Sequence, residues 1–422
     1  MRYVIILYPY FSLNERETGM KNIMPMTDFQ PLIQKLDSSW DEKEAALLIR
    51  RMIGAAWHTG SLDKAIIPPA EAFREILETR LARTEEPKAE MALFGLLYEL
   101  EQGMADREKA LETARHIFHL AETAEIPVDY VMASFRLAKA FLYLEKFVES
   151  ADWSLKAMKL GRELEQKGAP DEAFKRMLAD QESRLTVRLY VIGGMDEEID
   201  RAAASCIRRW EDLGDPVGLA DALGMISEAR LFQGRWEDSL EAARRALEEV
   251  GYPGKTQGTG YALWCGATSL GRQGDFEEAL KWANEAEQVN LDLNNAEAAI
   301  EARLTRAAIY CMAGNYPEAL EECEAIVLDV TSLNYDSLRD WALTDRAWYR
   351  MRLGLLTPVP EVEALCPDRK SPFRANILYL LSHVLQHSGK DGSSARIEAI
   401  SLYRQFGLSW HLERALRGEP YL

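Results

Sequence analysis

Three seven-residue motifs recur at a fixed spacing in this chain, and they constrain its fold more than any other feature. They read GRWEDSL from Gly234, GDFEEAL from Gly274 and GNYPEAL from Gly314. Each combines a Gly with an aromatic residue two positions later, then an acidic residue, a small residue and Leu, and the glycines are 40 residues apart. A fixed period of about 20 to 50 residues is typical of a stacked repeat array.

The chemistry of the motif indicates what is stacked. A Gly accepts the left-handed conformation that ends many helices, and acidic residues favour the first turn of the next helix. The small residue allows the two helices to approach closely, so each motif predicts the hinge of a helical hairpin. Replacing Gly274 or Gly314 is therefore expected to cost stability through the left-handed conformation and through crowding at the helix crossing. Further hinges, some with weaker motifs, predict about nine hairpins and lie near Gly60, Asp106, Phe147, Gly194, Gly354 and Gly389.

Helix-start signals place the first helix of each hairpin. Asp215-Pro216 is an N-cap followed by Pro at the first helical position, and Asn295 is an equivalent cap 80 residues later. From these signals and the hinges, the sequence predicts first helices over residues 216–233, 257–273, 296–313, 337–353 and 372–387. Because Pro358 and Pro360 interrupt the segment after Gly354, the second helix there is expected to be short.

The hinge resembles that of tetratricopeptide (TPR) repeats, which have a small residue seven positions before the hinge Gly and Ala five positions after it. Ala267 and Ala279 occupy these places around Gly274, and Ala307 and Ala319 do so around Gly314. The spacing of 40 residues exceeds the usual period of about 34. In this respect the chain resembles the sensor solenoids of bacterial LuxR-type ATP-dependent regulators. The resemblance implies an all-α fold, a right-handed α-solenoid, and leaves the ligand open because this repeat is a scaffold with many uses.

The repeat phase also suggests how the chain is divided. Residues 1–23 do not fit the phase and are expected to form a weakly ordered N-terminal extension, with Met24 or Met26 as the natural start. Residues 24–400 are expected to form the solenoid, and residues 401–422 a C-terminal capping helix that covers the open apolar end of the stack.

Composition argues against several classes of partner. The formal net charge is −18, which disfavours nucleic acid because phosphate binding needs clustered Lys and Arg. The sequence has no membrane-spanning run and no convincing signal peptide. Its five cysteines are odd in number and irregular in spacing, which fits a reducing, cytoplasmic location rather than a disulfide framework.

Catalytic signals are weak. Arg51 and His58 have a spacing that resembles the Arg-to-His signature of HEPN-type ribonucleases, but such a pair arises easily by chance in a helical protein. His383 and His387 are four residues apart on one helix, a spacing compatible with a metal, yet no further ligands are identifiable. We therefore expect no enzyme activity, no metal and no cofactor, and keep a ribonuclease or metal-dependent enzyme as the least favoured alternative.

The TPR resemblance implies that residues 13, 10, 6, 3 and 2 positions before each hinge Gly face a concave groove. Aromatic and Arg residues, which are enriched at binding hot spots, occur at or near these positions. The groove candidates are Tyr261, Trp264, Arg272, Trp341, Trp348, Arg352, Tyr379 and His383. For any one residue the alternative is packing between neighbouring first helices. The Lys and Asn that chaperone-binding members use to clamp a peptide carboxylate are not assembled here.

These observations favour a non-enzymatic TPR-like solenoid that binds a protein or peptide partner in its concave groove, with a regulatory or scaffolding role. The alternative is a sensor solenoid that binds a small molecule or a signalling peptide and acts on a separate effector.

Overall fold

The structure, a computed structural model, is all-α: the described residues form 20 helices and no strand. This confirms the expected all-α, TPR-like solenoid. The structure describes residues 29–58, 67–104, 106–144, 146–168, 171–192, 195–251, 256–293, 295–332, 336–355, 359–366, 372–405 and 408–419. The expected extension over residues 1–23 and the hinges at Gly60 and Gly194 lie outside these ranges.

The chain divides into two compact units, and the boundary lies at Gln181, within α8. The described part of the N-terminal unit has two successive hydrophobic clusters, one built from α1 to α4 and one from α4 to α7. Its helices are α1 (Phe29–Ser38), α2 (Glu42–His58), α3 (Ile67–Leu81), α4 (Pro87–Gly103), α5 (Arg107–Thr123), α6 (Pro127–Tyr143) and α7 (Phe147–Gln166), followed by the first half of α8 (Glu172–Ile192).

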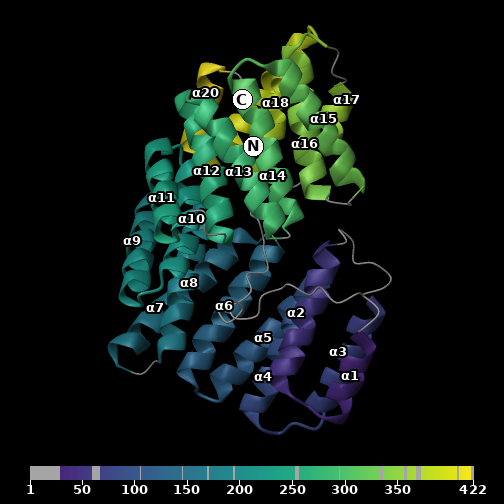
Figure 1. Cartoon of the computed structure of the whole chain (residues 1–422), viewed down its shortest axis with the longest axis vertical. Helices are drawn as coiled ribbons and strands as arrows, with labels where there is room; N and C mark the ends of the chain where they lie inside the picture. The colour runs from purple at the N-terminus through teal and green to yellow at the C-terminus, as the bar shows by residue number, and fades with distance from the viewer. Residues whose placement is uncertain are drawn as a thin grey trace. The chain divides into compact units, whose positions relative to one another are not determined.

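The C-terminal unit contains the three motifs that define the repeat, and its helices from α9 to α16 stand side by side in chain order (Figure 1). Its helices are α9 (Asp196–Asp212), α10 (Pro216–Phe232), α11 (Trp236–Glu249), α12 (Gln257–Gln273), α13 (Phe276–Asp292), α14 (Ala296–Met312), α15 (Tyr316–Ser332), α16 (Asp336–Arg352), α17 (Val359–Ala364), α18 (Pro372–His387), α19 (Ser393–Gln405) and α20 (Ser409–Arg417). The predicted first helices correspond to α10, α12, α14, α16 and α18 within one or two residues at each end. The short second helix expected after Gly354 is α17, with six residues.

The hinge glycines adopt the left-handed conformation that the motif requires. Their φ angles are positive at Gly234 (76°), Gly274 (88°), Gly314 (83°), Gly354 (71°) and Gly389 (71°). Asp215 and Asn295 also act as predicted: the Asp215 side chain accepts a hydrogen bond from the Gly218 N–H (2.9 Å), and Asn295 accepts one from the Ala298 N–H (3.2 Å). These contacts satisfy backbone donors that a helix leaves without intrahelical partners.

The two small residues of the motif meet where the helices of a hairpin cross. Ser227 and Ser239, seven residues before and five after Gly234, are fully buried. Each hydroxyl donates to the other residue's carbonyl oxygen, at 2.8 and 2.9 Å. In the next two hairpins the corresponding pairs are alanines, all with no exposed surface: Ala267, Ala279, Ala307 and Ala319.

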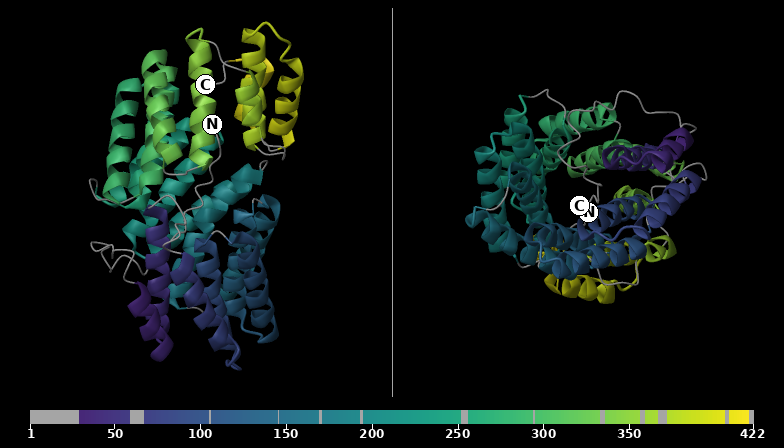
Figure 2. Two further views of the ribbon diagram at one scale, coloured as in Figure 1. Left: turned by 90° about the vertical axis from the view of Figure 1, so that its right-hand side faces the viewer. Right: turned by 90° about the horizontal axis from the view of Figure 1, so that it is seen from below.

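The first helices lie on the inner side of the C-terminal unit. Each first helix packs against the first helix of the next hairpin, from α10 through α18. Among the described residues, the second helices α11, α13 and α15 make at most isolated contacts with one another. Because helices are closer together on the inside of a curved stack, this packing places the first helices on its concave side. Figure 2 shows these helices from two further directions.

The backbone conformation, rather than steric crowding, makes the hinge glycines necessary. We expected crowding at the helix crossing to add to the cost of replacing Gly274 or Gly314. The structure corrects this expectation, because a Cβ built at either residue meets no atom within 4 Å. The cost should therefore come from the positive φ angle alone, which is on the order of 1 kcal/mol for a residue with a Cβ.

We predict that Gly314→Ala lowers the free energy of unfolding by about 1 kcal/mol, because Ala is strained at a φ angle of 83°. Gly314→Asn should cost less, since Asn tolerates the left-handed region better than Ala. Urea denaturation of the two variants beside the unchanged protein measures both effects. Equal stability of all three proteins would show that the hinge does not depend on backbone conformation.

Candidate functional site

The eight candidate residues are placed on three inner helices: α12, α16 and α18. Five of them are largely buried, with exposed fractions of 9% for Tyr261, 6% for Trp264, 5% for Trp341, 2% for Trp348 and 3% for Tyr379. Arg272 and His383 are half-buried, and Arg352 is exposed. The aromatic rings thus pack between neighbouring helices, which is the alternative to partner binding that the sequence left open for each candidate. That they also contact a partner stays a prediction.

An aromatic row crosses α8, α10 and α12. The ring of Tyr190 stacks on Phe232 with centroids 5.2 Å apart, and Phe232 contacts Trp264 at 6.3 Å. Tyr261 lies 6.2 Å from Trp264 in an edge-to-face arrangement. On the other side, the Trp264 Nε1–H donates to Thr305 Oγ1 of α14 at 2.7 Å. Trp264 therefore joins three consecutive inner helices.

A second group surrounds Trp348 on α16 and α18. The His383 ring lies 5.6 Å from the Trp348 ring and 4.8 Å from the Tyr379 ring, both edge to face. The Arg352 guanidinium lies 5.6 Å from the Trp348 ring and donates to the Tyr316 hydroxyl. The Tyr379 hydroxyl donates to the backbone oxygen of Glu419 at 2.5 Å and lies 3.3 Å from that of Arg414, which connects this group to the end of α20. The structure therefore brings Trp348, Arg352, Tyr379 and His383 together.

Basic side chains gather around the same end of the unit. The pKa of His383 is lowered by burial and by the nearby guanidinium groups of Arg396, Arg414 and Arg352. Burial, and then the charge of Arg414, lowers the pKa of Arg272 to about 10. Like charges that act on one another through a buried region produce a positive potential, which favours an anionic group there.

Buried carboxyl groups lie on the inner helices, and sequence reasoning did not select them as site residues. Glu228 on α10 is 4% exposed and Glu301 on α14 is 2% exposed. Burial raises the pKa of Glu228 to about 8. Burial also raises the pKa of Glu301 well above its usual value, and the nearby Glu297 and Glu228 raise it further. A signal was present, because Glu228 is six and Glu301 thirteen positions before a hinge Gly, both inner-face positions.

Asp345 on α16 is a third buried acid and occupies the same face. Its Oδ2 accepts a hydrogen bond from the Trp341 Nε1–H at 3.0 Å, while its Oδ1 has no hydrogen-bond partner. Burial raises the pKa of Asp345 to about 6. Glu301 Oε1 and His383 Nε2 also lack partners. Three successive inner helices thus each hold a buried polar atom that the protein does not satisfy.

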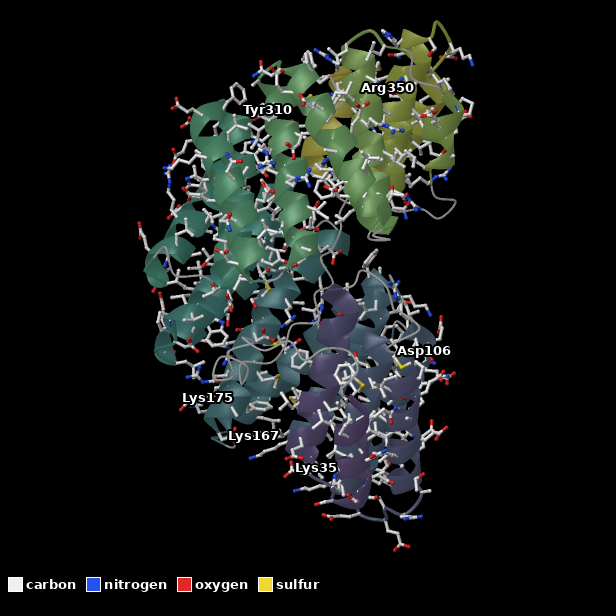
Figure 3. All side chains as sticks on the ribbon, turned by 45° about the vertical axis from the view of Figure 1, so that its right-hand side comes forward. Lys35, Asp106, Lys167, Lys175, Tyr310 and Arg350 are labelled. Carbon is white, nitrogen blue, oxygen red and sulfur yellow. The ribbon has the colours of Figure 1, made fainter. Side chains whose placement is uncertain are left out.

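Positions along the repeat can be compared in Figure 3, where Tyr310 and Arg350 are labelled. Both stand four positions before a hinge Gly, on α14 and α16, and both are half-buried. The residues of α14 and α16 that face the inner side stand at other distances from the hinge Gly, and they are three or four residues apart. Glu301 and Thr305 mark this face on α14, and Trp341 and Asp345 mark it on α16, since residues with this spacing share one side of a helix.

The sequence contained two weaker signals, a histidine pair and an Arg–His pair. Among the described residues, no group of three or more His, Cys, Asp or Glu side chains is placed to hold a metal ion. His383 is half-buried whereas His387 is exposed. The side chains of Arg51 and His58 lie outside those that the structure describes. No described helix is long and apolar enough to cross a membrane.

The fold is similar to that of several solved structures. A Rap protein complexed with competence and sporulation factor superposes with a TM-score of 0.54 and 13% identity, over 93% of this chain and 99% of that one. NprR in complex with its cognate peptide NprX gives a TM-score of 0.52 and 13% identity, over 84% of this chain and 98% of that one. At such identities the likeness shows the fold alone.

A third similar structure is a signal-transduction ATPase with a tetratricopeptide repeat sensor from Pyrococcus horikoshii. Its TM-score is 0.50 and its identity 14%, and the match covers 82% of this chain and 52% of that one. No protein-family model and no curated protein matches the sequence. The structural matches agree with the TPR-like solenoid that the hinge motifs indicate.

We predict that Trp348→Ala lowers the free energy of unfolding by roughly 3–5 kcal/mol, because it empties the space of a large side chain that is only 2% exposed. Trp348→Phe keeps an aromatic ring and should cost less. Urea denaturation measures both losses. If Trp348→Ala were as stable as the unchanged protein, the ring would not be part of the packing between α16 and α18.

We predict that Glu228 makes stability fall as the pH rises from about 4.5 to about 8. The folded protein holds a proton on this carboxyl group in a range where the unfolded chain has lost it, so raising the pH favours unfolding. Glu228→Gln should remove this contribution, on the order of a few kcal/mol at pH 8. Urea denaturation across this range tests it, with Glu241→Gln, an exposed residue of α11, as the control. The same slope in both variants would contradict the assignment.

Proposed function

We propose that the inner face of α10, α12, α14, α16 and α18 binds a peptide, or an extended segment of a protein partner. On this proposal the protein acts without catalysis, as a regulator or scaffold. The binding face consists of the inner-face positions of these helices, including the eight candidates and the buried acids Glu228, Glu301 and Asp345.

The buried polar atoms without partners carry this proposal. Glu301 Oε1, Asp345 Oδ1 and His383 Nε2 lie on successive inner helices. Buried polar groups in folded proteins nearly always have hydrogen-bond partners, because an unsatisfied one costs roughly 1–3 kcal/mol. A peptide suits such a row, since its backbone presents N–H and C=O groups at regular intervals along its length.

Charge and aromatic content support the same class of ligand. The binding face has buried acids on α10 and α14 and a basic group around His383 and Arg352. The Trp and Tyr rings pack between these helices and hold the charged groups in place, and a partner can contact only their remaining exposed edges. A peptide is also the ligand named for the similar NprR structure. A sensor role for a signalling peptide is the form of this function that the likeness favours.

We predict that His383→Ala weakens peptide binding by about tenfold or more, ~1.4 kcal/mol, because it removes the Nε2 atom that lacks a partner. The assay selects peptides from a phage-displayed library of random nonapeptides on the immobilised full chain. Synthetic copies are then measured by fluorescence anisotropy.

Lys390→Ala serves as the control, because Lys390 is exposed and follows α18. It should bind the selected peptides as the unchanged protein does. Failure to enrich any peptide, or equal affinities of the His383→Ala and Lys390→Ala variants, would overturn the proposed function.

A further inference from the structure

Two buried carboxyl groups flank a tryptophan on the binding face. Glu228 lies one helical turn before Phe232 on α10, and the Phe232 ring contacts Trp264 at 6.3 Å. Glu301 lies one turn before Thr305 on α14, and Thr305 accepts the hydrogen bond of Trp264 Nε1 at 2.7 Å. Since residues four apart share a helix face, both carboxyl groups lie on the side of their helices that faces Trp264.

The protein itself does not compensate these acids. Glu301 is 2% exposed, and its Oε1 atom has no hydrogen-bond partner. The titratable groups that face the pair are Glu297 on α14, whose charge raises the pKa of Glu301, and the thiol of Cys265 on α12, whose own pKa is raised by burial and by the two acids. No Lys, Arg or His in the described part of the chain acts on Glu228 or Glu301.

Packing alone does not explain such an arrangement. Burying a carboxyl group without a partner costs stability, and apolar side chains of similar volume would fill the same space without that cost. A cation from outside the chain would supply what is missing. Its attraction to the carboxylates would be strong because the site excludes water.

We propose that Glu228, Trp264 and Glu301 bind an arginine side chain of the peptide; this rests on the proposed function of the inner face. A guanidinium group fits the set chemically. It donates paired hydrogen bonds to carboxylates, and its flat face stacks on an indole ring. An ammonium group would gain the charge attraction without the stacking and the paired hydrogen bonds.

The protonation of the site gives the proposal a distinct signature. Burial holds Glu228 neutral at pH 7, with a pKa of about 8. An arginine stabilises the ionised form, so binding releases a proton to the solvent. The affinity for an arginine-containing peptide should therefore rise as the pH approaches 8, and a neutral peptide should not share this dependence.

The experiment uses the full chain and synthetic nonapeptide pools, acetylated and amidated, with one position fixed as Arg, citrulline or Lys and the others random. Citrulline has the shape of arginine without its charge. We expect the unchanged protein to bind the Arg pool at least about tenfold more tightly than the citrulline pool at pH 8, with Lys between them. The preference should shrink at pH 6.

Glu301→Gln and Glu228→Gln should abolish the preference, whereas the control Glu241→Gln on α11 should keep it. Circular dichroism confirms that the variants are folded. The comparison of binding at pH 6 and pH 8 uses only the unchanged protein. If all pools bind equally well, the arginine site is overturned and the proposed function stands. If no pool binds, the proposed function is overturned and the arginine site with it.

Discussion

The close contact between the two helices of each hairpin is the constraint on which the C-terminal unit depends. Ser227 and Ser239 meet with no exposed surface, and Ala267 meets Ala279 in the same way one repeat later. Larger side chains there would separate the helices. Because this contact fixes one face of the first helix against its own second helix, the opposite face is left for the neighbouring first helices and for the inner side. The position of the inner face, where we propose that a partner binds, therefore follows from two small residues per repeat.

The fold was largely predictable because its signals are local. A left-handed Gly, an N-cap and a small pair act within about a dozen residues, so Gly274, Asp215 and the Ala307–Ala319 pair could be interpreted without any tertiary information. The expected crowding at Gly314 was wrong for the same reason. It concerned atoms from other parts of the chain, and the space around a hinge cannot be derived from its own motif.

The placement of the candidate residues was predictable, but their environment was not. The repeat register placed Trp264, Trp348 and His383 on the inner helices. Their burial, however, depends on distant parts of the chain: Trp264 contacts Thr305, 41 residues away, and Trp348 and His383 contact each other from different helices. Glu228 and Glu301 were overlooked because this acidic chain contains 68 Asp and Glu residues, and one more Glu on a helix suggests a solvated surface. Only the packing of α10, α12 and α14 shows which of them are buried.

The short helix α17 has a consequence for how the array unfolds. In a linear array each hairpin is held chiefly by its neighbours, and the coupling between hairpins grows with the surface they share. With six residues, of which Val359 and Val362 are buried, α17 contributes far less of this surface than the 17-residue second helices α13 and α15. Among the described hairpins of the C-terminal unit, we therefore expect the α16–α17 hairpin to be the most weakly coupled. We therefore expect amide hydrogens on its two sides to exchange as separate cooperative blocks, with the C-terminal helices opening and reclosing while α10 to α14 stay folded.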